Sequence, residues 1–213
     1  MTTTRKVDTK ASDEPLVLVV DDDEHIREAL CDLLRSVGID ALCFASSQEF
    51  LGASLPDRPG CLVLDVRLPG LSGLDFQRHL ANQGNPMPIV FMTGFGDIPM
   101  SVRAMKAGAS DFLTKPFRDQ DMLDAVAGAI EKDRVRRRSR VAAEDAASQA
   151  ATLTPREREV MGAVVKGLMN KQIAAELGIS EVTVKLHRGN VMRKMQVRSV
   201  ADLVRKVELL ESS

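Results

Sequence analysis

Acidic, hydroxyl and amine side chains stand at the ends of four apolar segments in the first half of the chain. Asp21 and Asp22 follow LVLVV, Asp65 ends CLVLD, Thr93 ends IVFMT and Lys115 follows DFLT. Clustered carboxylates need a cation to offset their repulsion, and a ligand set made of oxygens suits Mg²⁺. An aspartate can also attack a phosphoryl group, while a lysine and a hydroxyl stabilise the charge that develops. These residue types therefore suit Mg²⁺-dependent phosphoryl transfer to an aspartate.

The segments that carry these residues alternate between two hydrophobic patterns. Short apolar runs predict strands at Leu16–Val20, Ala41–Phe44, Cys61–Leu64, Ile89–Met92 and Asp111–Leu113. Helical spacing lies between them at Glu24–Val37, Ser47–Ala53, Gly73–Asn82 and Ile98–Ala107, and a fifth helix begins near Asp119. Five such units predict a parallel sheet with helices on both faces and right-handed crossovers. Because sites in these sheets lie at the carboxyl ends of the strands, the polar residues are predicted to converge there.

Each of these residues also has an ordinary structural explanation. The run Asp21–Glu24 could be a solvated helix N-terminus, where carboxylates complement the helix dipole. Asp65 and Thr93 could belong to plain turns, and Lys115 could lie on the surface. Their joint occurrence after strands one, three, four and five, in chain order, favours a common site.

The composition is that of an ordinary globular chain. It has 213 residues, 44% of them hydrophobic, and a net charge of −1. No apolar run of about 18 residues predicts a membrane span, and residues 1–14, which lack the apolar stretch of a signal peptide, are predicted to form a flexible tail. Cys31, Cys43 and Cys61 adjoin apolar residues without metal-type spacing, which predicts reduced thiols in a cytoplasmic protein.

Charge is distributed unevenly along the chain. Residues 1–130 carry 12 lysines and arginines against 19 acidic residues, whereas residues 152–213 carry 11 against 7. An acidic first part and a basic last part favour a cation and a polyanion as the respective partners. Residues 131–151 between them contain no glycine or proline, which predicts a continuation of the fifth helix rather than a flexible linker.

The C-terminal part shows only helical patterns. Thr154–Glu157 is a capping box with proline at the first helical position, which predicts a helix start. Asn170–Leu177 is predicted as a second helix, Ser180 caps a third that reaches Met195, and Ser199–Glu211 is a fourth. The basic residues of the third helix suit DNA phosphates or base edges, although an isolated basic helix is more often an ordinary solvated surface.

Residues 15–130 resemble the receiver domain of two-component response regulators. Four stretches carry the resemblance in order and spacing: LVLVVDDDEHIREAL, CLVLDVRLPGLSGLD, PIVFMTGFGD and AGASDFLTKPF. The resemblance implies a CheY-like doubly wound (βα)5 fold with Asp65 as the phosphoacceptor. It also implies a Mg²⁺ ion held by Asp21, Asp22, Asp65 and the backbone carbonyl of Arg67.

The same resemblance assigns residues that respond to phosphorylation. Thr93 and Lys115 would bind the phosphoryl group, Gly94 would leave room for it, and Phe112 would be the switch aromatic. Phe95 stands where relatives of the FixJ kind often have histidine, so the lifetime of the phosphorylated form is left open.

Residues Leu153–Leu210 resemble the LuxR/FixJ-type output domain, an all-α four-helix helix-turn-helix domain. LTPREREV, KGLMNKQIAAELGIS and TVKLHRGNVMRKM carry the resemblance. The family places its third helix in the DNA major groove and binds as a dimer. The predicted DNA contacts are Asn170, Lys171, Thr183, Lys185, Leu186, His187, Arg188, Gly189 and Lys194. Of these, Lys185, Leu186 and Gly189 would face bases, and Asn170, Lys171, Thr183 and Lys194 would lie near phosphates.

Two positions depart from the usual output-domain pattern. Met169 replaces the usual proline, and Gly189 stands in the recognition helix, where many relatives carry a larger residue. A helical glycine costs about 1 kcal/mol of helix propensity. It could mark close approach to a neighbouring helix or to the DNA backbone.

The sequence therefore predicts a receiver at 15–130, a helical linker at 131–151 and a LuxR-type helix-turn-helix domain at 152–213. A sensor histidine kinase would phosphorylate the receiver, which would then dimerise through the fourth helix, fifth strand and fifth helix. The exposed charges expected on that face are Arg103, Lys106, Asp111 and Asp124. The dimer would bind promoter DNA and activate transcription with RNA polymerase.

Two other functions compete with this prediction. A Mg²⁺-dependent phosphatase could use Asp65 as its nucleophile, but it would need an acid two residues later, where Arg67 stands. A DNA-binding protein that never uses phosphorylation would be expected to have an incomplete acidic site.

Overall fold

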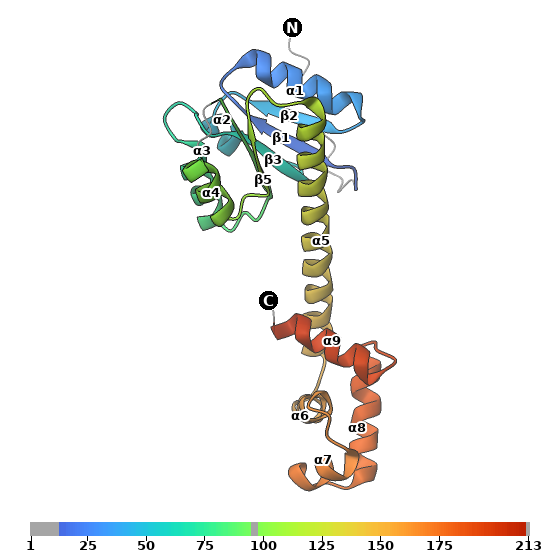
Figure 1. Cartoon of the computed structure of the whole chain (residues 1–213). Coiled ribbons are helices and arrows are strands. Elements are labelled where there is room, and N and C mark those ends of the chain that lie inside the picture. The colour runs from blue at the N-terminus through green and yellow to red at the C-terminus, as the bar shows by residue number, and fades with distance from the viewer. Residues whose placement is uncertain (1–12, 95–97, 212–213) are drawn as a thin grey trace. The chain divides into compact units, whose positions relative to one another are not determined.

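A computed structural model describes residues 13–94 and 98–211. The chain divides into two compact units, with the boundary between Arg136 and Arg137 (Figure 1). Each unit is described by itself. Most of the expected N-terminal tail, and Phe95, lie outside the described residues. Within the described ranges, no helix is both long enough and apolar enough to cross a membrane.

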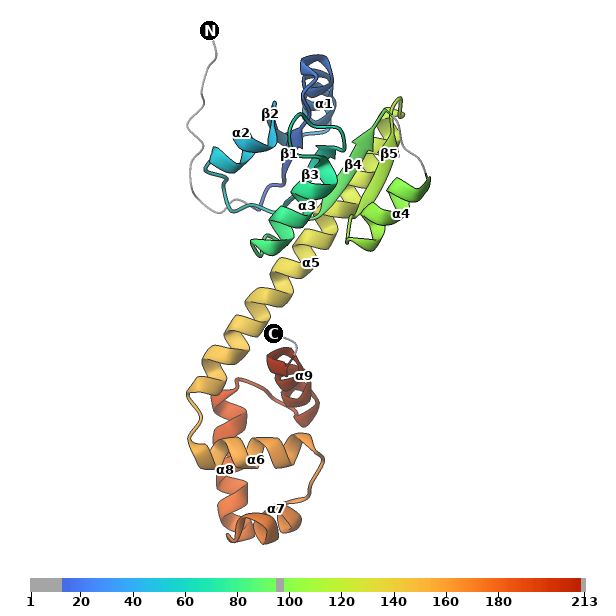
Figure 2. The ribbon, with the colours of Figure 1, turned by 90° about the vertical axis from the view of Figure 1, so that its left-hand side faces the viewer.

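The first unit is built on a five-stranded parallel sheet in the order β2-β1-β3-β4-β5 (Figure 2). Its strands are β1 (Leu16–Val20), β2 (Asp40–Phe44), β3 (Gly60–Asp65), β4 (Ile89–Thr93) and β5 (Asp111–Thr114). Each predicted strand is confirmed to within a residue at either end. The strands read as continuous apolar runs because parallel sheets are covered on both faces.

Helices cover the two faces of the sheet. They are α1 (Glu24–Ser36), α2 (Ser47–Gly52), α3 (Gly73–Asn82), α4 (Ile98–Lys106) and the first part of α5 (Asp119–Ala151). Alternate residues of each strand point to opposite faces. Leu18 and Leu64 therefore pack with Phe76 of α3, while Val17 and Val63 pack with residues of α1 and α5. The doubly wound α/β fold predicted from the sequence is confirmed.

Helix α5 runs without a break from Asp119 to Ala151. The first unit extends beyond residue 130, where the sequence places the end of the receiver. Asp133 is fully buried, and its carboxylate accepts a hydrogen bond from the Gly60 backbone nitrogen at 3.1 Å. This contact attaches a further turn of α5 to the start of β3.

The second unit contains α6 (Pro155–Val165), α7 (Asn170–Leu177), α8 (Glu181–Lys194) and α9 (Val200–Glu211). The capping box at the start of α6 is confirmed, because Thr154 and Glu157 each donate a backbone N–H to the other's side chain. Gly178 caps the C-terminus of α7, and its φ of 65° suits a residue without Cβ. Buried side chains of all four helices form one core: Val160, Ile173, Val184, Val191, Met195 and Leu203.

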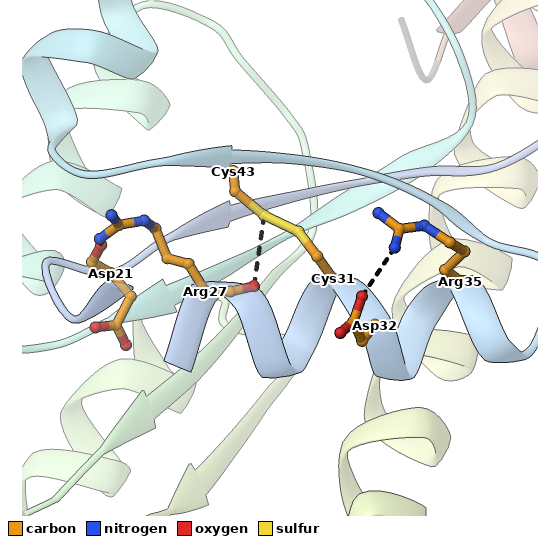
Figure 3. The surroundings of a disulfide bond; sticks show 6 residues. All are labelled: Asp21, Arg27, Cys31, Asp32, Arg35 and Cys43. Atoms are coloured by element: carbon orange, nitrogen blue, oxygen red, sulfur yellow. Dashed lines mark hydrogen bonds and ion pairs between the residues drawn. A yellow bond between two sulfur atoms is a disulfide. The ribbon is translucent and has the colours of Figure 1, made fainter. Parts of the chain in front are cut away.

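The prediction of three reduced cysteines was wrong for two of them. Cys31 of α1 and Cys43 of β2 form a disulfide bond (Figure 3). Cys61 is a free, buried thiol. Burial, with a smaller contribution from the charge of Asp133, raises the pKa of the Cys61 thiol to about 12. The sequence predicted the wrong oxidation state for Cys31 and Cys43, because their pairing depends on the packing of α1 against β2.

Candidate functional site

The carboxyl ends of β1, β3 and β5 bring four of the predicted residues together. Asp21, Asp22 and Asp65 each offer a carboxylate oxygen, and these oxygens lie within 4.8 Å of one another. The ammonium of Lys115 lies 2.6 Å from Asp21 Oδ2 and 2.6 Å from Asp65 Oδ2. We call Asp21, Asp22 and Asp65 the acidic site.

Asp21 is held from several sides. It is fully buried, and its backbone nitrogen donates to the Phe44 carbonyl at 3.3 Å. The guanidinium of Arg27 donates to the Asp21 carbonyl at 2.8 Å, and the Asp23 backbone nitrogen donates to Asp21 Oδ1 at 2.9 Å. Sequence reasoning missed Arg27, which reads as an ordinary surface residue of α1.

Asp65 is positioned by the loop that follows β3. Its Oδ1 accepts a hydrogen bond from the Arg67 backbone nitrogen at 2.8 Å, so the Arg67 peptide lies beside the acidic site. Gly73 was also missed. A Cβ at Gly73 would lie 2.4 Å from the Asp65 carbonyl oxygen, so only glycine allows α3 to begin this close to the strand end. The glycine in PGLSGLD was the available signal.

The electrostatics of the acidic site leave excess negative charge. Burial raises the pKa of the Asp21 carboxyl despite its hydrogen bond from Lys115. Burial lowers the pKa of the Lys115 ammonium, but hydrogen bonds to Asp21 and Asp65 outweigh it, and the net pKa is raised. One ammonium faces three carboxylates, and the donors are hard oxygens. This set fits Mg²⁺.

The two predicted switch residues lie on neighbouring strands. Thr93 is fully buried at the end of β4, and its carbonyl accepts from the Lys115 backbone nitrogen at 2.7 Å. Phe112 of β5 is half-buried, and its ring centroid lies 6.4 Å from that of Phe91. Both residues are therefore next to the strand ends that carry the acidic site.

In the second unit, one face of α8 is exposed. Four residues lie on it, Val182, Lys185, Leu186 and Gly189, and residues Val182 and Leu186 are 76% and 63% exposed. Apart from its chain neighbours and the backbone of its own helix, a Cβ at Gly189 would meet no described atom within 4 Å. Close approach to a neighbouring helix of this chain therefore does not explain Gly189. Exposed apolar side chains beside a lysine suit the major groove, where thymine presents a methyl group.

The other predicted DNA contacts lie on α8 and at the start of α7. Arg188 donates to Asn170 Oδ1 at 2.7 Å, which joins α8 to the start of α7. Thr183 donates its backbone nitrogen to Ser180, the cap of α8, and Lys171 is exposed. His187 is half-buried, and its Nδ1 has no hydrogen-bond partner among the described residues.

Lys194 makes two contacts within the second unit. Its ammonium donates to the buried carboxylate of Glu157 at 2.6 Å and to the Thr152 carbonyl at 3.0 Å. These contacts give Lys194 a role within the fold, and its predicted phosphate contact stays a prediction. Met169, the departure before α7, donates its backbone nitrogen to Gln172 at 2.8 Å. A proline has no N–H and could not make this bond.

Each of the two units matches a known protein family. Residues 17–127 match the response regulator receiver domain, and residues 151–207 match the bacterial regulatory proteins of the luxR family. The chain belongs to the two-component response regulators with a LuxR-type DNA-binding output domain, a family of transcription regulators and not of enzymes. The family predicted from the sequence is thereby confirmed, and it implies a kinase partner and promoter DNA.

Relatives match over nearly the whole chain. Nodulation protein W of Bradyrhizobium diazoefficiens is 56% identical over 95% of this chain and 89% of its own length. Transcriptional regulatory protein FixJ of the same organism is 44% identical over 89% of this chain and 92% of its own. The solved structure of the response regulator StyR is similar with a TM-score of 0.78 and 50% identity, covering 92% of this chain and 98% of that one.

Proposed function

We propose that a sensor histidine kinase phosphorylates Asp65, and that the phosphorylated protein dimerises, binds promoter DNA and activates transcription. The observation that carries the proposal is Lys115, whose ammonium lies between Asp21 and Asp65 at 2.6 Å from each. A receiver needs a carboxylate nucleophile beside a cation, and this arrangement supplies both. The chain has all five residues that a phosphorylated receiver needs: Asp21, Asp22, Asp65, Thr93 and Lys115. Their presence argues against a DNA-binding protein that never uses phosphorylation.

In the proposed reaction, the Asp65 carboxylate attacks the phosphorus atom of the kinase phosphohistidine. The bond from phosphorus to the imidazole nitrogen breaks, and an acyl phosphate forms on Asp65. Asp21, Asp22, Asp65 and the Arg67 backbone carbonyl would hold Mg²⁺, which when bound offsets charge on the phosphoryl oxygens. Lys115 would leave its carboxylate partners in part and pair with the phosphoryl group.

The response would pass through Thr93 and Phe112. The Thr93 hydroxyl would donate to a phosphoryl oxygen, and Phe112, half-buried on the next strand, would move into the space left behind. These residues adjoin the face formed by α4, β5 and α5. Val102 and Met105 of α4 are 44% and 46% exposed, which gives this face apolar surface for a dimer contact. Charged pairs there are worth only about 0–1 kcal/mol each, so apolar burial would provide most of the dimer affinity.

The output domain, proposed for residues 152–213, would place α8 in the major groove. Lys185, Leu186 and Gly189 would face bases, with His187 and Arg188 beside them. Asn170, Lys171 and Thr183 would contact phosphates. A dimer would bind two related half-sites in the cytoplasm and contact RNA polymerase. Residues 15–130 would form the receiver, and residues 131–151 the helical linker.

The direct test is labelling of the protein by acetyl phosphate. Wild type should gain one phosphoryl group in the presence of Mg²⁺ and none in the presence of a chelator, as measured by intact mass. Asp65→Asn should gain none, with Asp75→Asn as the matched control because Asp75 lies outside the acidic site. Equal labelling of Asp65→Asn and wild type would refute the proposal.

Dimerisation is tested separately with beryllofluoride, a phosphoryl mimic. Light scattering should show the mass of a dimer for the beryllofluoride form at micromolar concentration and that of a monomer without it. A beryllofluoride form that stays monomeric would contradict the dimerisation step. Rapid turnover of a generic phosphate ester would instead favour a phosphatase.

A further inference from the structure

The disulfide bond joins α1 to the edge strand of the sheet at an accessible place. Figure 3 shows Cys31 and Cys43 joined by the disulfide. Both cysteines are half-buried and line a surface hollow of about 460 Å³. The hollow is otherwise lined by charged residues of α1: Glu24, Arg27, Glu28, Asp32 and Arg35. A small thiol reagent can therefore reach the sulfur atoms.

The two bonded elements also hold the Asp21 peptide from opposite sides. Arg27, one helical turn before Cys31, donates to the Asp21 carbonyl at 2.8 Å. Phe44, the residue after Cys43, accepts from the Asp21 backbone nitrogen at 3.3 Å. Cys43 Sγ also lies 3.8 Å from the Arg27 carbonyl oxygen (Figure 3). The disulfide thus fixes the spacing of the two groups that position Asp21.

We propose that Cys31 and Cys43 form a redox site, which a dithiol reduces and a disulfide oxidises, and that its state tunes the Mg²⁺ affinity of the acidic site. The inference rests on the proposed Mg²⁺ site. With the bond intact, α1 and β2 hold Asp21 where its carboxylate meets those of Asp22 and Asp65. With the bond broken, α1 can shift against β2, and the Asp21 carboxylate is less well placed.

The chemistry is ordinary thiol–disulfide exchange. A thiolate of the dithiol attacks one sulfur of the Cys31–Cys43 bond, which forms a mixed disulfide and releases the other cysteine as a thiolate that takes up a proton. The second thiolate of the reductant then attacks the mixed disulfide. The reductant leaves as a cyclic disulfide, two electrons and two protons have passed to the protein, and both cysteines are thiols.

Cys61 provides an internal control. It is fully buried in β3 and is not bonded to another cysteine. Because its thiol is buried and only the thiolate is nucleophilic, Cys61 should stay inert in the folded protein. Reagents that modify Cys31 and Cys43 should spare it.

The experiment compares oxidised and reduced full-length protein. Iodoacetamide should add nothing to the oxidised protein and two groups, on Cys31 and Cys43, after treatment with dithiothreitol. Mg²⁺ titrated into each form by calorimetry should bind the reduced form roughly threefold or more weakly. This is less than the ~10–100-fold cost of deleting an outer-shell partner, because Arg27 and Phe44 are displaced and not removed.

Variants separate the redox effect from other causes. Cys31→Ser should bind Mg²⁺ like the reduced wild type and should not respond to dithiothreitol, and Cys43→Ser should behave the same way. Circular dichroism checks that each variant is folded, and using both keeps the test valid if one is not. Arg27→Ala should narrow the difference in Mg²⁺ affinity between the oxidised and reduced forms.

The outcomes distinguish the inference from the proposed function. If Cys31 and Cys43 are both still alkylated after exposure to a disulfide oxidant, the disulfide does not form and the proposal of a redox site is wrong. Equal Mg²⁺ affinity of the two forms would overturn the coupling while the metal site stands. If neither form binds Mg²⁺, the proposed metal site fails, and this inference fails with it.

Discussion

The ammonium of Lys194 at the end of α8 lies 2.6 Å from the carboxylate of Glu157 in the first turn of α6. Glu157 is buried, with its side chain 4% exposed, and it also accepts from the Thr154 backbone nitrogen. Removing one partner of such a pair leaves the other charge buried without compensation. The pair therefore joins the end of α8 to the start of α6 and stabilises the fold.

Lys194→Ala should destabilise the output domain. We expect a loss of about 2 kcal/mol, between the values for exposed and buried pairs, because Lys194 keeps some exposure. Urea unfolding followed by circular dichroism measures the loss. Lys171→Ala is the matched control and should leave stability unchanged. If the Lys194→Ala protein is as stable as wild type and its DNA binding depends less on salt, Lys194 instead contacts a DNA phosphate.

Acid should weaken the same contact in a defined pH range. The hydrogen bond from Lys194, with that from Thr154, lowers the pKa of the Glu157 carboxyl from 4.5 to about 2. A carboxylate with a lowered folded pKa adds stability above its unfolded pKa and loses it as pH falls toward the folded value. The difference in unfolding free energy between wild type and Glu157→Gln should therefore be constant above pH 5 and shrink from about pH 4.5 toward pH 2. A difference that stays constant down to pH 3 would contradict this.

Lys115→Met should increase the affinity of the acidic site for Mg²⁺. The substitution removes a cation that lies against two carboxylates and competes with the metal. We expect Mg²⁺ affinity to rise by at least about fivefold. Two unit charges 4 Å apart interact with an energy of about 1 kcal/mol even in bulk water, and the substitution removes this repulsion between Lys115 and the metal. Calorimetric titration measures it, with the exposed Lys106→Met as control. Weaker Mg²⁺ binding by Lys115→Met would mean that the acidic site is not the metal site.

Substitutions on the DNA-binding surface should fail in two different ways. Lys185→Ala should cost about 1–3 kcal/mol on the best site and relax discrimination at one base position. Lys171→Ala should weaken binding evenly across sequences and reduce the salt slope by about one unit, because one fewer counterion is released. Titrations at several salt concentrations, on a selected site and a scrambled one, separate the two effects. If both variants bind both DNAs as tightly as wild type does, the recognition surface lies elsewhere.

Local patterns determined most of the fold from the sequence alone. The apolar runs of the strands, the capping box at Thr154 and the turn at Gly178 depend on residues close together in the chain, and all are present in the structure. The convergence of Asp21, Asp65 and Lys115 also followed, because the carboxyl ends of parallel strands share one edge of the sheet.

Only the tertiary structure decided which partners the polar and sulfur-containing side chains find. Lys194 reads as a basic helix residue, yet it pairs with Glu157, 37 positions away. Cys31 and Cys43 read as separate thiols until α1 is packed against β2. Asp133, in the expected linker, accepts from Gly60, 73 positions away. Residue type and spacing determine periodicity and chemistry, but burial depends on how distant elements pack. For that reason the sequence alone predicted the acidic site but not these three contacts.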